Sequence, residues 1–199
     1  GANLGDRDQQ LAESLRRHPG IQAYEVVQPA ETLRATVLGA SSQTVTLSGS
    51  TIWAEREILP LRNVPVIRPD LDLTPDLAAD AIAAAVLSAL RRWDINLASD
   101  DFAVAFDLQR ALDYTLLLKL AAGLAEFSRS LPEGRPLVII IGRDYAQALG
   151  QTIKAMIPQR PLLVIDQVGL SEGDYIDIGA PLMDGRVVPL SVKTLVFYH

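Results

Sequence analysis

One stretch in the second half of the sequence constrains the fold more than any other. Leu137–Ile141 is an unbroken apolar run of mostly β-branched residues, which is typical of a strand buried on both faces. A helical pattern follows, with Leu149 and Ile153 on one side, and it ends before Pro158. Pro161–Ile165 then repeats the buried-strand pattern. Strand, helix and strand in this order predict a right-handed βαβ unit, and therefore an α/β domain.

The residues that follow the first of these strands form a candidate ligand site. Gly142, Arg143 and Asp144 lie where the carboxyl end of a parallel strand meets a helix N-terminus, a natural place for an anion. Asp144, with Gln147 three residues later, also fits the N-cap of that helix in a pattern close to a capping box. The segment therefore supports two interpretations, an anion site or a capped turn.

The rest of the chain predicts further elements around this unit. Pro19-Gly20 is expected to end a first helix, and Thr74-Pro75 to begin a later one, because a cap followed by proline is a strong helix start. We expect helices at residues 8–17, 29–40, 74–92 and 109–131, and strands at 21–27, 44–53, 65–67, 102–106 and 187–197. The predicted fold is a small αβαβ piece followed by an α/β domain with a mostly parallel sheet of about five strands flanked by helices.

Composition narrows the class of protein. The chain has 199 residues, of which 49% are hydrophobic and 21% charged, as expected of a globular protein with a sizeable core. A net charge of −6 argues against a nucleic-acid or anionic-membrane binder, and the lack of cysteine excludes disulfides and thiol chemistry. Lys119 and Gly123 interrupt the longest apolar stretch, so no membrane helix is predicted. With no signal peptide before Leu11, we expect a cytoplasmic protein.

Few residues carry an evident chemistry. Asp166, Asp174 and Asp177 are oxygen ligands of the kind that magnesium or calcium prefers, although aspartate and glycine are also what tight turns require. His18 and His199 lie at a helix end and at the chain end, where solvated residues are expected. In the whole sequence no glycine is followed by Lys-Ser or Lys-Thr, so a phosphate loop of that kind is absent.

The segment Gly173–Gly179 is the most distinctive local sequence. Strand alternation predicts that Ile176 and Ile178 point inward and that Tyr175 and Asp177 point outward. In a doubly wound sheet the segment would emerge at the carboxyl ends of the strands, where ligands and partners dock. Tyr175 and Asp177 are therefore candidates for a contact surface, whereas the alternative is a turn whose isoleucines fill a sheet edge.

Longer patterns resemble known proteins. Pro29–Ala40 reads Pro-Ala-Glu-Thr-Leu-Arg-Ala-Thr-Val-Leu-Gly-Ala and resembles the Pro-x-Glu-x-Val-Ala-x-Gly-Ala-Ala helix of actin-like and heat-shock-70-like ATPases. A resemblance to the ethanolamine ammonia-lyase reactivating factors covers nearly the whole chain in the same order, through Gly39-Ala40, Leu47–Trp53, Leu59–Pro65, Ala148–Gly150, Gly173–Gly179 and Val192–Phe197. Ser41 departs from the glycine that this family usually has after Gly39-Ala40, which bears on any backbone role at this turn.

This resemblance implies a function that needs more than these residues. Members of the family resemble actin-fold ATPases that use ATP to exchange damaged cobalamin on ethanolamine ammonia-lyase for intact adenosylcobalamin. Their phosphate and adenosine loops lie N-terminal to the matching region, and neither Asp-x-Gly-x-Thr nor Gly-Gly-Gly-Thr occurs in this sequence. The resemblance therefore implies a C-terminal fragment, in which residues 1–56 belong to the ATPase lobe and residues 57–199 form an accessory α/β domain.

The expected ligands and partners follow from the same resemblance. We expect no cofactor and no catalysis in these residues alone, and ATP with magnesium in the full-length protein. The expected partners are ethanolamine ammonia-lyase and the N-terminal ATPase region, a homo-oligomer is left open, and association with a bacterial microcompartment is a further expectation. Two alternatives stay open. One is an independent small-molecule-binding domain with a crevice at Gly142-Arg143 and Gly173–Gly179, and the other is an interaction module with a flat apolar surface.

Overall fold

The computed structural model describes two compact units separately. They are Gly1–Gly39 and Ala40–His199. The described residues are 14–15, 17–22, 42–47, 52–74, 76–108, 111–182 and 187–194. The expected helix at 29–40 and the end of the last expected strand, at 195–197, therefore lie outside the described residues.

The first unit contains a short helix that the sequence did not predict. Residues 14, 15 and 17 are helical and His18 is not, so the expected first helix ends before Pro19-Gly20, as predicted. Helix α2 (Pro19–Gln22) then begins at Pro19 itself. Proline is tolerated at the first helical position, because its missing N–H has no partner there in any helix. His18 accepts a hydrogen bond on Nδ1 from the Gly20 N–H at 3.2 Å, so this histidine caps the helix. The strand expected at 21–27 is wrong at its start, since Ile21 and Gln22 are helical; residues 23–27 lie outside the described residues.

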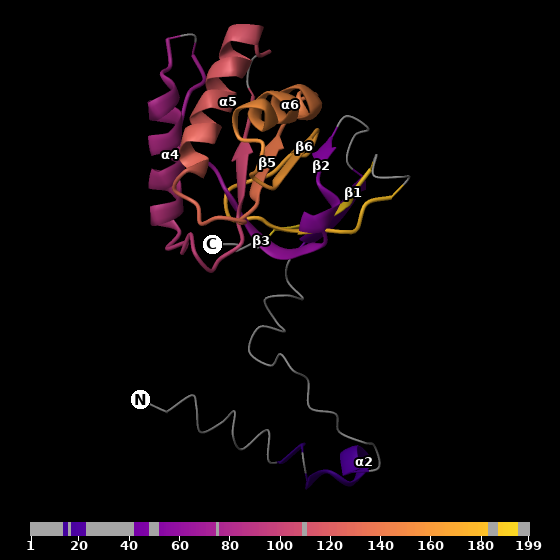
Figure 1. Ribbon diagram of the computed structural model, residues 1–199. Helices are drawn as coiled ribbons and strands as arrows, with labels where there is room; N and C mark the ends of the chain where they lie inside the picture. The colour runs from indigo at the N-terminus through magenta and orange to yellow at the C-terminus, as the bar shows by residue number, and fades with distance from the viewer. Residues whose placement is uncertain are drawn as a thin grey trace, which may run out of the picture. The chain divides into compact units, whose positions relative to one another are not determined.

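The second unit is built on a mixed sheet (Figure 1). In the described residues its strands lie in the order β1-β8-β7-β3-β4-β5-β6-β2. Strands β3 to β6 pair in parallel, and the other pairings are antiparallel. The α/β class is confirmed, but the sheet is larger and more mixed than expected. The strands are β1 (Ser42–Leu47), β2 (Trp53–Ala54), β3 (Leu61–Ile67), β4 (Ala103–Phe106), β5 (Leu137–Ile141), β6 (Leu162–Asp166), β7 (Tyr175–Ile178) and β8 (Pro189–Thr194).

Three helices cover one face of the parallel strands. They are α4 (Ala79–Arg92), α5 (Tyr114–Ser128) and α6 (Ala146–Met156), and each connects two successive parallel strands. Right-handed crossovers that progress in one direction place their helices on the same face. Accordingly, all three helices share one core with alternate strand residues such as Val104, Ile139 and Val164. The parallel strands are thus wound in one direction only, so the reversal of strand order that a doubly wound sheet would contain is absent from them.

The antiparallel strands cover the opposite face. A second core joins Ala105, Ile140 and Ile165 of the parallel strands to Ile176 of β7 and Leu190 of β8. Strands β1 and β2 lie at opposite ends of the strand order, yet only residues 48–52 separate them. A link of that length spans at most about 20 Å, so the sheet curls until its two edges approach each other. Strands β4, β5 and β6 are consequently buried on both faces, whereas Arg62 and Asn63 in the first half of β3 are exposed.

Two helices begin later than the sequence suggested. Thr74 forms only a turn, in which its carbonyl accepts from the Leu77 N–H at 3.0 Å, and α4 begins at Ala79. The helix expected from residue 109 begins at Tyr114, because Asp113 is its N-cap and accepts from the Leu116 N–H at 2.8 Å. The N-cap residue Asp113 thus marks the start of α5 better than the apolar pattern that precedes it.

The division into two compact units does not show whether residues 1–56 and 57–199 are separate domains. Both β1 and β2, from the region assigned to residues 1–56, pair into the sheet of the second unit. Trp53 of β2 packs against Gly150 of α6 so closely that a Cβ at residue 150 would collide with it. The Glu55 carboxylate lies 2.5 Å from the Lys154 ammonium and adds an ion pair between β2 and α6. The assignment of residues 1–56 to an ATPase lobe stays a prediction.

Candidate functional site

The carboxyl edge of the parallel strands carries two hollows. The first, of about 270 Å³, lies beside the helices and is lined by residues 71–74, Asp107, Leu108, Leu112 and Leu116. The second, of about 160 Å³, is lined by Arg68, residues 105–107, Ile140, Gly142 and residues 168–170. We call residues 167–174 the strap, and this second space the strap hollow. Asp107 lines both hollows.

Hydrogen bonds and an ion pair attach the strap to neighbouring elements at several points along its length. Arg68 donates to the Leu170 carbonyl at 3.4 Å. Glu172 accepts from the Trp93 indole N–H at 3.2 Å and lies 3.6 Å from the Arg92 guanidinium. The Asp174 carbonyl accepts from the Val66 N–H at 2.9 Å, where β7 begins beside β3. The strap therefore crosses from β6 to β3 over the ends of the strands between them.

The segment Gly142-Arg143-Asp144 serves the fold at this edge. The Gly142 N–H donates to the Phe106 carbonyl at 3.1 Å, and Arg143 Nε donates to the Leu108 carbonyl at 2.8 Å. The N-cap of α6 is Tyr145, so the prediction that Asp144 caps this helix is wrong. Instead, the Ala146 N–H donates to Asp166 Oδ2 at 3.1 Å. A carboxylate of the chain itself thus lies where an anion at this helix N-terminus was expected.

Asp174 and Tyr175 lie at the start of β7. Asp174 is 3% exposed, and its Oδ2 accepts from the Ser171 N–H at 2.7 Å in the turn that ends the strap. Tyr175 is half-buried and pairs with Pro65 of β3 and Lys193 of β8. Ile176 and Ile178 are buried between half-buried Tyr175 and Asp177, which confirms the predicted alternation.

Asp177 belongs to a polar cluster on the outer face of the antiparallel strands. Its carboxylate lies 2.5 Å from the Lys193 ammonium and accepts from the Asn63 N–H at 2.7 Å. Lys193 also donates to the Asn63 side-chain carbonyl at 2.9 Å. Burial raises the pKa of Asp177, but hydrogen bonds from Lys193 and Asn63 and the charges of Lys193 and Arg62 outweigh it, so the pKa is lower than usual. The cluster joins β3, β7 and β8.

The three predicted cation ligands do not meet. Asp166 binds the start of α6, Asp174 closes the strap, and Asp177 pairs with Lys193. Within the described ranges, no three His, Cys, Asp or Glu side chains are grouped so that they could hold a metal ion. The alternative interpretation, that these acids stabilise turns and strands, fits their contacts.

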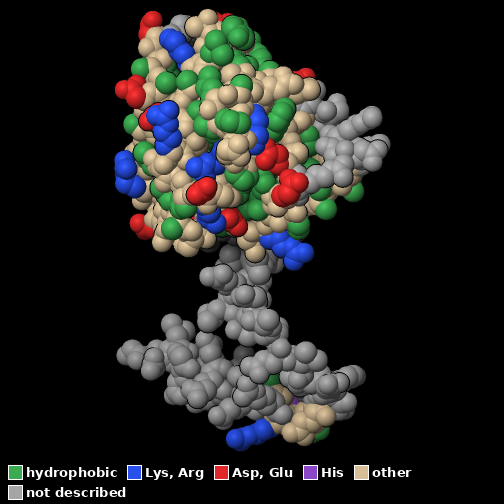
Figure 2. All heavy atoms as spheres, viewed as in Figure 1, with side chains coloured by type: hydrophobic (Ala, Val, Ile, Leu, Met, Phe, Trp, Pro, Cys, Tyr) green, Lys and Arg blue, Asp and Glu red, His purple; other side chains and the backbone are tan. Residues whose placement is uncertain are grey.

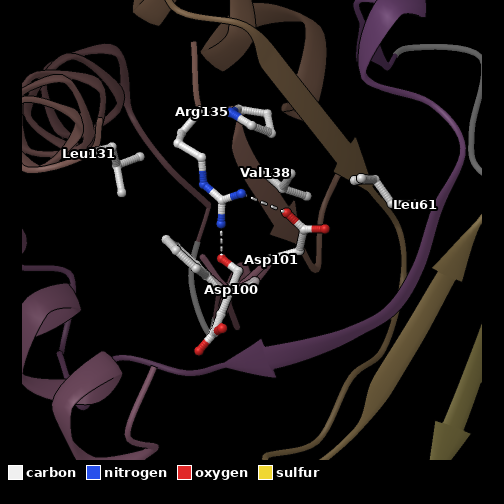
Figure 3. A pocket seen from close by; sticks show the side chains of 8 residues that line it. Leu61, Asp100, Asp101, Leu131, Arg135 and Val138 are labelled. Carbon is white, nitrogen blue, oxygen red and sulfur yellow. Dashed lines mark hydrogen bonds and ion pairs between the residues drawn. The ribbon is translucent and has the colours of Figure 1, made fainter. Parts of the chain in front are cut away.

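A small pocket of about 10 Å³ lies at the opposite, amino-terminal end of the strands (Figure 3). The guanidinium of Arg135 points between Asp100 and Asp101, donating to the Asp100 carbonyl and lying 3.3 Å from the Asp101 carboxylate. A backbone hydrogen bond from Asn96 and one from the Ser99 hydroxyl lower the pKa of Asp100. These contacts fix the chain at the start of β4, and the space is too small for an organic ligand.

Sequence reasoning missed Arg68 and Asp107 as site residues. Each follows directly on a parallel strand, Arg68 after β3 and Asp107 after β4, as Gly142 does after β5. Residues in that position of adjacent parallel strands gather at one edge. The signal was therefore present, but Arg68, which follows the strand expected at 65–67, was interpreted as a surface or ion-pair residue rather than a ligand.

Neither the described helices nor the visible surface adds a feature of its own to the site. None of these helices combines the length and apolar character that a membrane crossing requires. On the face shown in Figure 2, apolar, acidic and basic side chains of the second unit are interspersed.

Comparison with known proteins identifies close relatives. The family model for ethanolamine utilisation protein EutA matches residues 2–198. The ethanolamine ammonia-lyase reactivase EutA of Salmonella typhimurium is 42% identical over 187 residues, and that of Escherichia coli is 41% identical over the same length. Each alignment covers 94% of this chain and 38% of the relative, so the chain spans less than half the length of either. No solved structure matches the chain.

Proposed function

The chain belongs to the ethanolamine utilisation protein EutA family, and we propose that it forms the C-terminal part of a reactivating factor for ethanolamine ammonia-lyase. The observation that carries this proposal is the family match over residues 2–198. The two reactivases, at 41–42% identity over 94% of the chain, support the same substrate enzyme. Identity at this level across both units argues for a shared role rather than a shared fold alone.

In the proposed mechanism, the full-length protein uses ATP and magnesium to exchange damaged cobalamin on the lyase for adenosylcobalamin. The resemblance of Pro29–Ala40 to a helix of actin-like ATPases supports an ATPase lobe next to this chain. Backbone N–H groups in glycine-rich loops normally cradle the phosphates, and the expected loop sequences are absent from these 199 residues. We therefore assign nucleotide binding to the part of the relatives that the chain does not cover.

The second unit would act as a rigid module that contacts the lyase or the ATPase lobe. Two cores cover both faces of its parallel strands, so it can transmit a movement without deforming. Of the two contact candidates on β7, half-buried Tyr175 keeps an outward position, whereas Asp177 is already paired with Lys193 and Asn63. We expect Tyr175 to contribute to binding, and Asp177 to hold the strands that present it.

Reactivation by the full-length protein tests the proposal. Lyase inactivated with damaged cobalamin should regain activity when full-length protein, adenosylcobalamin and magnesium-ATP are added. The 199-residue chain alone should restore none. In the full-length protein, Tyr175→Ala should reduce reactivation with an unchanged melting temperature, and Asp177→Ala should lower stability as well. Recovery of activity with the 199-residue chain and no ATP would contradict the assignment.

A second candidate function is binding of a small molecule by the second unit itself. The hollows of about 160 and 270 Å³ at the carboxyl edge favour it, because α/β proteins bind ligands at that edge. The strap hollow, of about 160 Å³, lies at Gly142, as the crevice hypothesis expected. Residues 168–170 line it in place of Gly173–Gly179.

A further inference from the structure

The strap hollow has one charged group of each sign among the described residues that line it. These are the guanidinium of Arg68 and the carboxylate of Asp107. Both follow the ends of adjacent parallel strands, and residues 168–170 of the strap line the hollow together with them. The side chain of Arg68 is 33% exposed, so its charge is partly shielded from water while it stays accessible from the hollow.

The bonds of Arg68 are long compared with those of a structural arginine. Its Nη1 lies 3.4 Å from the Leu170 carbonyl and its Nη2 lies 3.5 Å from Asp107 Oδ2, both at the limit of a hydrogen bond. Arg160, by contrast, donates to four backbone carbonyls near the end of α5 at 2.5 to 3.2 Å. An exposed ion pair such as Arg68–Asp107 contributes little, so an incoming anion can replace Asp107 at small cost.

About half of the lining of the hollow is apolar. Ala105, Ile140 and Val168 belong to this apolar part and are almost fully buried. An apolar wall lowers the local dielectric constant and strengthens the attraction between a guanidinium and an anion. At Gly169 a Cβ would meet no atom within 4 Å, so the strap leaves open space beside its backbone at this point.

We propose that the strap hollow binds a small organic monocarboxylate. The guanidinium of Arg68 holds the carboxylate, because its planar fork matches carboxylate geometry. A body of a few carbon atoms packs on Ala105, Ile140 and Val168. Asp107 repels a second negative charge, which selects monoanions over phosphate. A volume of about 160 Å³ lies below that of pockets for drug-sized ligands and limits the ligand to a fragment. The site does not depend on the proposed reactivation role.

The test is a titration of the ¹⁵N-labelled 199-residue chain with butyrate at constant ionic strength, followed by the amide resonances of Gly142 and Gly169. These resonances should shift saturably with butyrate and less with inorganic phosphate at equal concentration. Arg68→Gln should weaken butyrate binding by about tenfold or more. Asp107→Asn should instead tighten binding several-fold, since it removes a repelling charge. Arg129→Gln, on the exposed end of α5, is the matched control and should leave binding unchanged.

The two variants are expected to change the butyrate affinity in opposite directions, so the test does not depend on either variant alone. If Arg68→Gln loses its dispersed spectrum through unfolding, the gain expected from Asp107→Asn still tests the site. Shifts that fail to saturate, or equal affinity in the unmodified chain and in Asp107→Asn, would overturn the proposal. So would equal or tighter binding of phosphate, which would indicate a general attraction of anions rather than this site.

Discussion

At the scale of single residues, the Asp177–Lys193 pair makes stability depend on pH. The pKa of Asp177 in the folded chain is below its ordinary value of 3.8, so the ionised form stabilises the fold above that pH. This contribution is lost as the pH falls through the lower folded pKa. Asp177→Asn should reduce stability at pH 7 by up to about 1 kcal/mol, since the pair is partly exposed. Urea unfolding should show that the free energy of unfolding falls less between pH 7 and pH 3 in Asp177→Asn than in the unmodified chain. Exposed Asp76→Asn should behave like the unmodified chain. An equal fall in all three proteins would rule the pair out as a pH-dependent contact.

The same scale shows where a local pattern is sufficient. The inward positions of Ile176 and Ile178 follow from the two-residue period of a strand, which depends on no distant group. The cap of α6 could not be predicted in the same way. Asp144 had the right chemistry, but Asp166 reaches the Ala146 N–H from the end of another strand, and only the folded chain brings them together. Arg68 and Asp107 were missed for a similar reason, because their strands become neighbours only in the sheet.

At the scale of elements, Gly123 sets the approach of α4 and α5. A Cβ at this position would lie 2.5 Å from Ile82 Cβ and 2.7 Å from the Ala79 carbonyl oxygen, so the helices would have to separate. Gly123→Ala should therefore destabilise the second unit by about 1–3 kcal/mol through overpacking, although alanine is the better helix former by up to about 1 kcal/mol. Gly169→Ala, which meets open space, is the control for chemical denaturation and should stay within about 0.5 kcal/mol of the unmodified chain. A more stable Gly123→Ala would mean that the helices can move apart freely.

Strands were easier to predict than helix starts. The continuous apolar runs at β4, β5 and β6 were located within one residue, because a strand buried on both faces leaves no polar alternation to misinterpret. Helix starts depend on which of several caps is used. Thr74 and Asp113 both fit an N-cap, but only Asp113 accepts the hydrogen bond from the helix that follows.

At the scale of the whole molecule, the curl of the sheet was beyond the sequence patterns. Strand β1 pairs with β8 across about 150 residues of sequence, and no local signal specifies which edges meet. The βαβ unit at residues 137–166 predicted the class, because its connections are short and have one hand. It did not predict that α4, α5 and α6 lie on one face of the parallel strands, or that antiparallel strands cover the other.

The last prediction, also at the scale of the whole molecule, concerns the binding of ATP. Tight nucleotide binding needs several backbone N–H groups around the phosphates and a magnesium ion held by oxygen ligands. The expected glycine loops are absent from the sequence, and the described residues contain no group of three metal-ligating side chains. Asp72 and Asp107 line the larger carboxyl-edge hollow and would repel a triphosphate. Isothermal titration of the 199-residue chain with magnesium-ATP should therefore give no micromolar binding, whereas the full-length protein should give a stoichiometric isotherm. A clear isotherm with the 199-residue chain would place a complete nucleotide site in these residues and would sink the assignment of ATP binding to the remainder of the protein.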